Sequence, residues 1–214
     1  MTKSKSKFSE IRLATPKDLE RILETEKAAF VNEPHETIEG LRFIMERGHI
    51  FIMPGTGAIT ELIPTESLLD ADIQDLSPES PLRMLIENDL KSGVLRNVTR
   101  EFDGRRIYYR HGTVVPASHR NKGYGSFLIQ ESDREILSPD DVVVSYVMAD
   151  PPNLPSIRMH FKTNGDIDKL EGNIHEQDIS YFRIVHNARI KVRDEYTIQI
   201  TIKDDYINSV RYLL

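Results

Sequence analysis

The chain contains no cysteine and no tryptophan among its 214 residues. The lack of cysteine excludes disulfide bonds, a thiol nucleophile and thiolate metal ligands. No apolar run approaches the roughly 18 residues that would cross a bilayer. The first residues, Met1 to Lys7, are polar and basic with no apolar segment behind them, unlike a signal peptide. We therefore expect a cytoplasmic protein with no membrane partner.

The charged and metal-binding residue types show no concentration that would define a function. The seven histidines are scattered, and none falls in HExxH or another ligand spacing, so we expect no metal. The formal net charge of −6 argues against nucleic acid as a partner, because a binding surface would have to be basic against the overall field. The same charge suits a cationic amine. The length is enough for one domain with its own core.

Periodicity and turn residues predict alternating strands and helices in a mixed α/β chain. Thr15-Pro16 is typical of a helix start, and Gly48 of a helix end. The expected elements are a strand at 11–13, helices from Thr15 and at about 36–47, strands at 49–53 and 58–63, a helix around 82–90, a strand at 106–115, a helix ending before Ser138-Pro139, a strand at 141–148, a helix at 153–164, and strands at 179–185 and 196–202.

These elements divide the chain into three parts. Residues 1–8 are expected to be a flexible basic tail, residues 9–187 the main domain, and residues 188–214 a C-terminal β extension. Within the domain, residues 64–93 are rich in Pro, Ser and Asp and are expected to form an irregular insertion.

A glycine-rich turn follows the strand-like segment that ends at about residue 115. Gly123 and Gly125 let the backbone turn tightly and approach an anion, and the helix that follows presents N–H groups and the positive end of its dipole. Arg120 and Lys122 add positive charge. GxGxxG would need a glycine where Leu128 stands, and the P-loop pattern is also absent. The turn therefore predicts a diphosphate cradle, against the alternative of a solvated turn with incidental basic residues.

A second block of polar residues follows the 141–148 strand. Asn153, Ser156 and His160 fit the pattern N-x-x-[AS]-x-x-x-[YH]. This block and the R-x-x-G-x-G turn together resemble the acetyl-CoA-binding signature of the GCN5-related N-acetyltransferases. The resemblance implies the α/β fold of that superfamily, in which a mixed central sheet with a splayed fourth and fifth strand is flanked by helices. Gly165 stands one residue later than in the usual pattern, and Asp166 replaces an aromatic residue.

By the same resemblance, acetyl-CoA is the expected co-substrate. The bulged fourth strand would leave backbone groups of Val114 and Val115 for the pantetheine arm, with the Val115 amide as donor to the thioester carbonyl. Asn153 would also bind the pantetheine arm, although capping its helix is a sufficient role. The diphosphate would be bound by the turn residues Arg120, Asn121, Lys122, Gly123, Tyr124, Gly125 and Ser126.

Acetyl transfer to an amine needs groups that move protons, and three residues are candidates. His111, nine residues before Arg120 as in aralkylamine N-acetyltransferases, is the first candidate base; a satisfied strand histidine is the alternative. Glu26 is the second, because it shares a helical face with apolar residues, or it reaches solvent at the helix end. His160 is the candidate acid toward the sulfur, although counting back from Gly165 would place Phe161 there.

These observations predict an N-acetyltransferase that transfers acetyl from acetyl-CoA to a primary amine by direct attack in a ternary complex. The stretch Glu26 to Phe30 resembles bacterial relatives of aralkylamine N-acetyltransferase, so a small-molecule amine is the expected partner. A non-catalytic acyl-CoA-binding regulatory module and a protein-lysine acetyltransferase stay open. The alternating strand at 196–202 could cover the domain's own sheet or pair two copies of the chain in a homodimer.

Overall fold

Seven strands form one mixed sheet in the computed structural model, which describes residues 10–31, 34–149, 152–172 and 180–186. The strand order is β1-β2-β3-β4-β5-β7-β6. Neighbouring strands are antiparallel except β4 and β5, which are parallel. The strands are β1 (Arg12–Leu13), β2 (His49–Met53), β3 (Ala58–Pro64), β4 (Ile107–Val114), β5 (Val142–Met148), β6 (Gly165–Gly172) and β7 (Ser180–His186).

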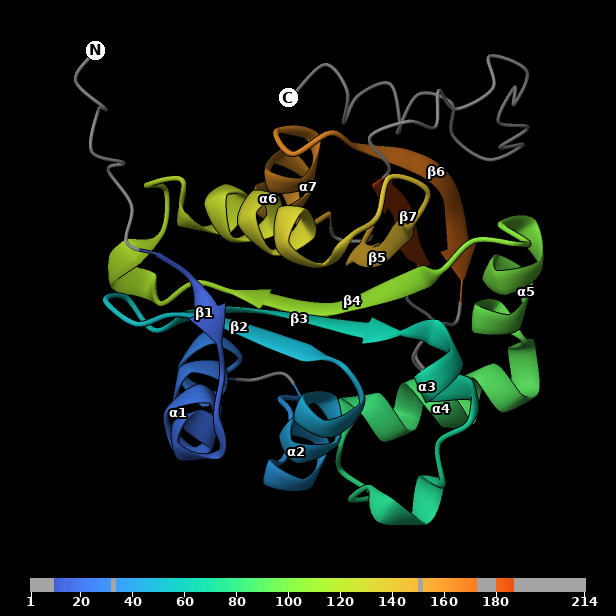
Figure 1. Cartoon of the computed structure of the whole chain (residues 1–214), viewed down its shortest axis with the longest axis horizontal. Coiled ribbons are helices and arrows are strands. Elements are labelled where there is room, and N and C mark those ends of the chain that lie inside the picture. Colours follow the sequence, from blue (N-terminus) through green and yellow to red (C-terminus); the bar gives the residue numbers. More distant parts are fainter. Residues whose placement is uncertain (1–9, 32–33, 150–151, 173–179, 187–214) are drawn as a thin grey trace.

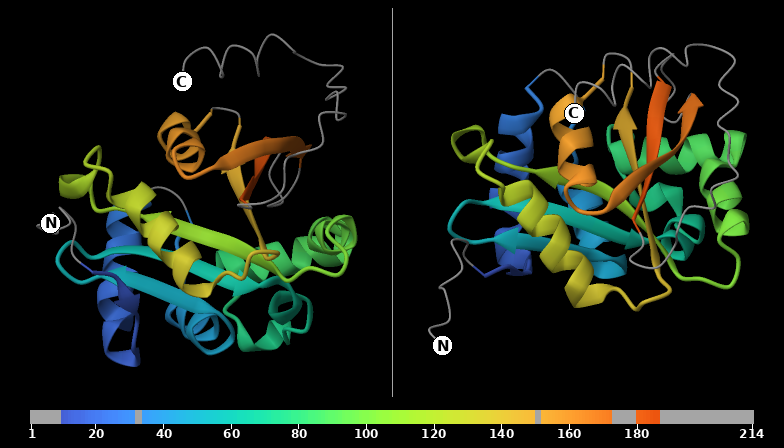
Figure 2. Two further views of the ribbon diagram at one scale, coloured as in Figure 1. Left: turned by 45° about the horizontal axis from the view of Figure 1, so that its top comes forward. Right: turned by 90° about the horizontal axis from the view of Figure 1, so that it is seen from above.

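Helices cover both faces of this sheet. The helices α1 and α2 lie on one face of β2, β3 and β4, and α6 lies on the other, next to α7 (Figures 1 and 2). This arrangement confirms the α/β fold class. The helices are α1 (Leu19–Ala29), α2 (Ile38–Arg47), α3 (Thr65–Leu69), α4 (Pro81–Ser92), α5 (Val94–Glu101), α6 (Tyr124–Ile136) and α7 (Leu154–Phe161), with single 3-10 turns at Pro16–Asp18, Ile73–Asp75 and Ala117–His119.

The helix boundaries follow from capping residues that the sequence shows. The Asp18 carboxylate accepts hydrogen bonds from the backbone N–H and the hydroxyl of Thr15, each at 2.8 Å, just before α1. The Thr37 hydroxyl accepts from the Gly40 N–H at 3.1 Å and begins α2, and Gly48 ends it. Each such cap contributes about 1 kcal/mol, so the predicted starts of the first two helices are confirmed.

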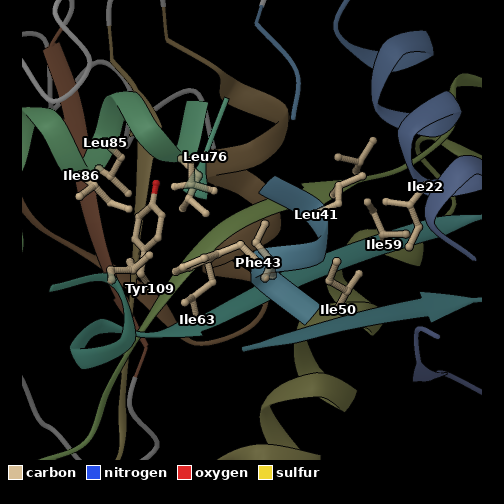
Figure 3. Close-up of a cluster of buried hydrophobic side chains, with 14 of the residues drawn as sticks. Ile22, Leu41, Phe43, Ile50, Ile59, Ile63, Leu76, Leu85, Ile86 and Tyr109 are labelled. Carbon is tan, nitrogen blue, oxygen red and sulfur yellow. The ribbon is translucent and has the colours of Figure 1, made fainter. Parts of the chain in front are cut away.

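The main core lies between the sheet and the helices α1, α2 and α4 (Figure 3). Ile22 of α1 and Leu41 of α2 are fully buried against Ile59 of β3, and Leu85 of α4 extends the same layer. Burying one such side chain contributes roughly 1.5–3 kcal/mol relative to leaving it exposed. This buried layer therefore fixes the positions of α1, α2 and α4, the helices that bring residues to the candidate active site.

The insertion is more regular than the sequence suggested. Residues 64–93 contain α3, a 3-10 turn and α4, and a further unexpected helix, α5, follows at once. Gly93 separates α4 from α5 with φ +68°, a left-handed conformation that favours glycine. The buried Asp89 carboxylate accepts from the Leu95 N–H at 2.6 Å, which holds the start of α5. The expected helix around 82–90 is present as α4, and the rest of residues 64–93 is more regular than expected.

The sequence missed β6. Its register shifts between Ile167 and Lys169, so Ile167 is buried while Leu170 is exposed. Because the bulge interrupts the alternation of apolar residues, the period-two signal of a strand is lost. The predicted tail at 1–8, the strand at 196–202 and the extension at 188–214 lie outside the described residues.

The parallel strands β4 and β5 separate halfway along their length. They pair only from Ile107 to Arg110, after which β4 continues beside β3 and β5 continues beside β7 (Figure 2). On β4, Gly112 lies opposite Glu61 and Arg110 lies opposite Leu62, so His111 is one extra residue without a partner in β3. The expected bulge and splay are therefore present, and His111 stands where the two strands part.

Candidate active site

The glycine-rich turn joins β4 to α6. Asn121 and Gly123 have φ of +60° and +87°, and α6 begins at Tyr124. Because the residue before the helix is a glycine, no side chain of its own caps the helix N-terminus. Gly125 lies against Met159 of α7, where a Cβ atom would collide with the sulfur. The turn thus brings the start of α6 close to α7 with an N-terminus suited to an anion.

Two basic residues of the turn bond to its own backbone. Arg120 Nε donates to the carbonyl oxygen of Val115 at 3.1 Å, and Lys122 Nζ donates to that of Ser118 at 2.7 Å. Both side chains are exposed. The turn therefore holds positive charge at the open end of the splayed strands, beside Val114 and Val115 and together with Asn121, Tyr124 and Ser126 of the predicted set.

Asn153 lies at the start of α7, as expected. Its Oδ1 accepts from the Ser156 N–H at 3.2 Å. This bond is the helix cap that the sequence offered as a sufficient role, so the pantetheine contact stays a prediction.

His111 is largely buried, with its side chain 10% exposed, and its Nε2 lies 3.0 Å from Oε2 of Glu36. Burial lowers the pKa of His111, but the hydrogen bond to Glu36 and the charges of Glu61, Glu36 and Glu26 outweigh it and raise the pKa to about 9. The ring is therefore an imidazolium at neutral pH, with Nε2 donating to Glu36. It has to lose this proton before it can act as a base.

Glu36, which precedes α2, is the hydrogen-bond partner of His111. Its carboxylate also accepts from the Ser80 hydroxyl at 2.5 Å and from the Leu82 N–H at 3.2 Å, both at the start of α4. Burial raises the pKa of Glu36, but the hydrogen bond and charge of His111, with these further donors, outweigh it and hold the pKa below its ordinary value. The insertion thus takes part in the site through α4. The carboxylate also lies against Gly40, where a side chain would displace it.

Glu26 reaches the same place from α1, although it stands 85 positions before His111. It is 4% exposed, and its Oε2 accepts from the Glu36 N–H at 2.7 Å. Burial raises its pKa. The structure therefore places both candidate bases in one cluster of four residues, Glu26, Glu36, Glu61 and His111, which we call the acidic cluster.

Glu61 of β3 is the member that sequence reasoning missed, together with Glu36. It is 0% exposed, and neither of its carboxylate oxygens has a hydrogen-bond partner among the described residues. Burial and the charge of Glu26 raise its pKa well above the ordinary value. A glutamate in the otherwise apolar stretch Ala58 to Ile63 was the signal that could have identified it, since a buried carboxylate is costly unless it is used.

His160 lies in α7 and is 3% exposed. It contacts β7, which is separated by β5 from the strand β4 that carries His111. Its Nδ1 is 2.7 Å from Nε2 of His186, whose Nδ1 is 3.3 Å from the carbonyl oxygen of Thr163. A carbonyl only accepts, so His186 carries its proton on Nδ1 and accepts from His160 at Nε2. Burial lowers the pKa of both rings, that of His186 to about 3. A neutral His160 in this arrangement has no proton on Nε2, which argues against its predicted role as the acid.

The fold that carries these features is similar to the folds of solved structures. The chain has the fold of the GCN5-related N-acetyltransferases. A polyamine N-acetyltransferase of Drosophila melanogaster superposes with a TM-score of 0.59 at 11% identity, over 83% of this chain and 99% of that one. NAA60 of Arabidopsis thaliana in complex with acetyl-CoA gives 0.55 at 15% identity, over 83% and 98%.

The same fold also carries a different reaction. The GNAT-like decarboxylase GphF in complex with isobutyryl-CoA gives a TM-score of 0.54 at 14% identity, over 83% of this chain and 98% of that one. No family model and no curated protein matches the sequence. Because the matched enzymes of this fold differ in acceptor and reaction, the special likeness to aralkylamine enzymes stays a prediction. In the part of the chain that the structure describes, no helix is long and apolar enough to cross a membrane.

Proposed function

We propose that this protein is an acetyl-CoA-dependent N-acetyltransferase that transfers acetyl directly to a primary amine of a small molecule. The observation that carries the proposal is the position of His111: the bulge residue at which β4 leaves β5, within a cluster of buried carboxylates. The matched acetyl-CoA complex and polyamine enzyme support the co-substrate and the acceptor class. A cytoplasmic location belongs to the same proposal.

In this proposal acetyl-CoA lies between the splayed strands. The N-terminus of α6, Arg120 and Lys122 bind the diphosphate, and the backbone of Val114 and Val115 binds the pantetheine arm and the thioester carbonyl. The acetyl group then lies near His111, because that residue is three positions before Val114 on the same strand.

The acidic cluster supplies the proton acceptor. An amine attacks only as the free base, so its ammonium form must lose a proton first. His111 Nδ1, which has no partner among the described residues, accepts this proton once the ring is neutral, and Nε2 stays bonded to Glu36. Glu26 is the second candidate for the same task. A thiol has a pKa of about 8.5, so the coenzyme A thiolate can leave without a strong acid.

The test is an amine panel in which release of free coenzyme A is measured with acetyl-CoA as donor. We expect turnover of at least one primary amine, and kcat that rises between pH 7 and 9 as the imidazolium of His111 loses its proton. His111→Gln should lower kcat at least 100-fold with little change in acetyl-CoA affinity. Arg120→Ala should weaken acetyl-CoA binding without a comparable loss of kcat at saturation.

Two alternatives are decided by the same measurements. Acetyl-CoA binding without turnover of any amine, peptide or protein would favour a regulatory acyl-CoA-binding module. Turnover of lysine-containing peptides at far higher kcat/KM than any small amine would favour a protein-lysine acetyltransferase. Acetyl-CoA affinity unchanged in Arg120→Ala would remove the turn from the binding site.

A further inference from the structure

Glu61 is unlike the other carboxylates of the acidic cluster. Glu36 accepts from four donors, and Glu26 accepts from the Glu36 N–H. Glu61 is equally buried, yet both of its oxygens lack a partner among the described residues. Leaving a buried polar group without a partner costs about 1–3 kcal/mol. A fold that keeps such a residue on a central strand leaves two hydrogen-bond acceptors for something else.

The surroundings of Glu61 show what these oxygens face. Its side chain lies over Gly112, where an added Cβ would be 3.0 Å from Oε2. This places it beside the bulge at His111, in the half of β4 that is not paired with β5. His111 Nδ1 also has no partner among the described residues. Three polar atoms without partners therefore gather where the two strands part.

Several titratable groups interact electrostatically with Glu61. They are Glu26 from α1, Glu36 from the segment before α2, and His111 and Tyr109 from β4. Burial raises the pKa of Tyr109 above its ordinary value, so its hydroxyl is neutral. The region thus holds three carboxyl groups against one imidazole, and it attracts a further cation.

The kind of cation follows from the donors that are needed. In the described part of the chain, no three histidine or carboxylate side chains are placed to hold a metal ion. The oxygens of an ionised Glu61 accept and do not donate, so the ligand must bring N–H groups and a positive charge. A primary ammonium has three such donors, enough for Glu61 and for a neutral His111 Nδ1 at once.

We propose that Glu61 binds the charged nitrogen of the acceptor, so that the site selects amines in their ammonium form. This inference rests on the proposed function and names the residue that determines acceptor class. The ammonium that Glu61 holds passes one proton to Nδ1 of neutral His111, and its lone pair then attacks the thioester carbonyl. After the C–N bond forms, the C–S bond breaks, and the second N–H proton passes to the departing thiolate, so that coenzyme A leaves as the thiol.

Glu61→Gln is the test, because it keeps the size of the side chain and removes its charge. Glu46→Gln, which removes an exposed carboxylate on α2, is the matched control. Butylamine, 1,4-diaminobutane and phenethylamine are the probes, with 1-butanol as the neutral comparison. We expect KM for the amines to rise at least tenfold in Glu61→Gln, kcat to change less, and acetyl-CoA affinity to stay the same. The control should match the wild type.

Calorimetry of amine binding gives a readout that is independent of turnover. When binding releases protons, the heats measured in phosphate and in HEPES differ, because the two buffers take up a proton with different enthalpies. Because burial raises the pKa of Glu61, ammonium binding should release protons from the wild type and fewer from Glu61→Gln, and 1-butanol should not bind. If the variant fails to fold, proton release by the wild type and its discrimination against 1-butanol decide the matter.

The outcomes separate this inference from the proposed function. Amine turnover with the same KM in Glu61→Gln and wild type would overturn the inference and leave the function standing. Amine binding that depends on Glu61, without turnover of any acceptor, would overturn the function and leave the binding site standing. Failure of all three amines to bind the wild type, or an equal loss in Glu46→Gln, would also overturn the inference.

Discussion

Removal of the His111 imidazole should change how the stability of the protein depends on pH. The folded protein raises the pKa of His111 to about 9, against about 6.5 in an unfolded chain. The charged ring therefore stabilises the fold fully below pH 6.5, and this stabilisation is lost as the pH rises from 6.5 through 9. A difference of about 2.5 pKa units corresponds to about 3 kcal/mol.

The measurement is urea unfolding of the wild type and His111→Gln between pH 6 and 9.5, followed by circular dichroism. The difference in unfolding free energy between the two proteins should shrink by about 3 kcal/mol over this range. His49→Gln is the control, because burial lowers the pKa of His49, so its removal should not reproduce a change in stability toward pH 9. Wild-type and His111→Gln curves that stay parallel from pH 6 to 9.5 would refute the imidazolium at the centre of the site.

Three further predictions concern the groups around this site. The folded pKa of His186 is about 3, so the wild type should lose up to about 5 kcal/mol of stability between pH 6.5 and 3, and His186→Gln should lose less over the same range in acid unfolding experiments. Gly40→Ala should displace the Glu36 carboxylate and so lower the pKa of His111. An NMR titration of the His111 ring signals should then have its midpoint at a lower pH than in the wild type, and an unchanged midpoint would contradict the contact between Gly40 and Glu36. Asp133→Asn should leave the buried Arg110 without its counter-charge and destabilise the fold by about 3–5 kcal/mol in thermal unfolding, whereas Asp140→Asn, at an exposed position, should not.

The part of the site that the sequence predicted is the part that is local in the chain. The turn from Arg120 to Ser126 carries its function in its own backbone, so glycine spacing and charge were enough to place it. The caps of α1 and α2 are local for the same reason. His111 and Glu26 were identified as separate candidates. That they meet could not be read from the chain, because the packing of α1 against β4 brings them together.

The part that the sequence missed is assembled from distant segments or hidden by irregular pairing. The role of Glu36 depends on the helix α4, because Ser80 at the start of that helix donates a hydrogen bond to Glu36 from 44 positions away. The sequence alone does not show that these two residues meet. The insertion looked irregular because prolines and serines mark turns, yet Pro81 and Ser80 here begin a helix. For β6, the bulge removed the alternating pattern by which strands are recognised.

The charge balance of the acidic cluster joins stability to catalysis. Three buried carboxyl groups surround one imidazole, and burial raises the pKa of two of them, Glu26 and Glu61. If all three were ionised, the single imidazolium would leave the cluster with two negative charges out of contact with water, which is unfavourable. The free protein therefore holds protons there, and a bound ammonium can take the place of one. Such an exchange leaves the net charge of the cluster unchanged, so the amine binds without adding an uncompensated charge to a site that is out of contact with water.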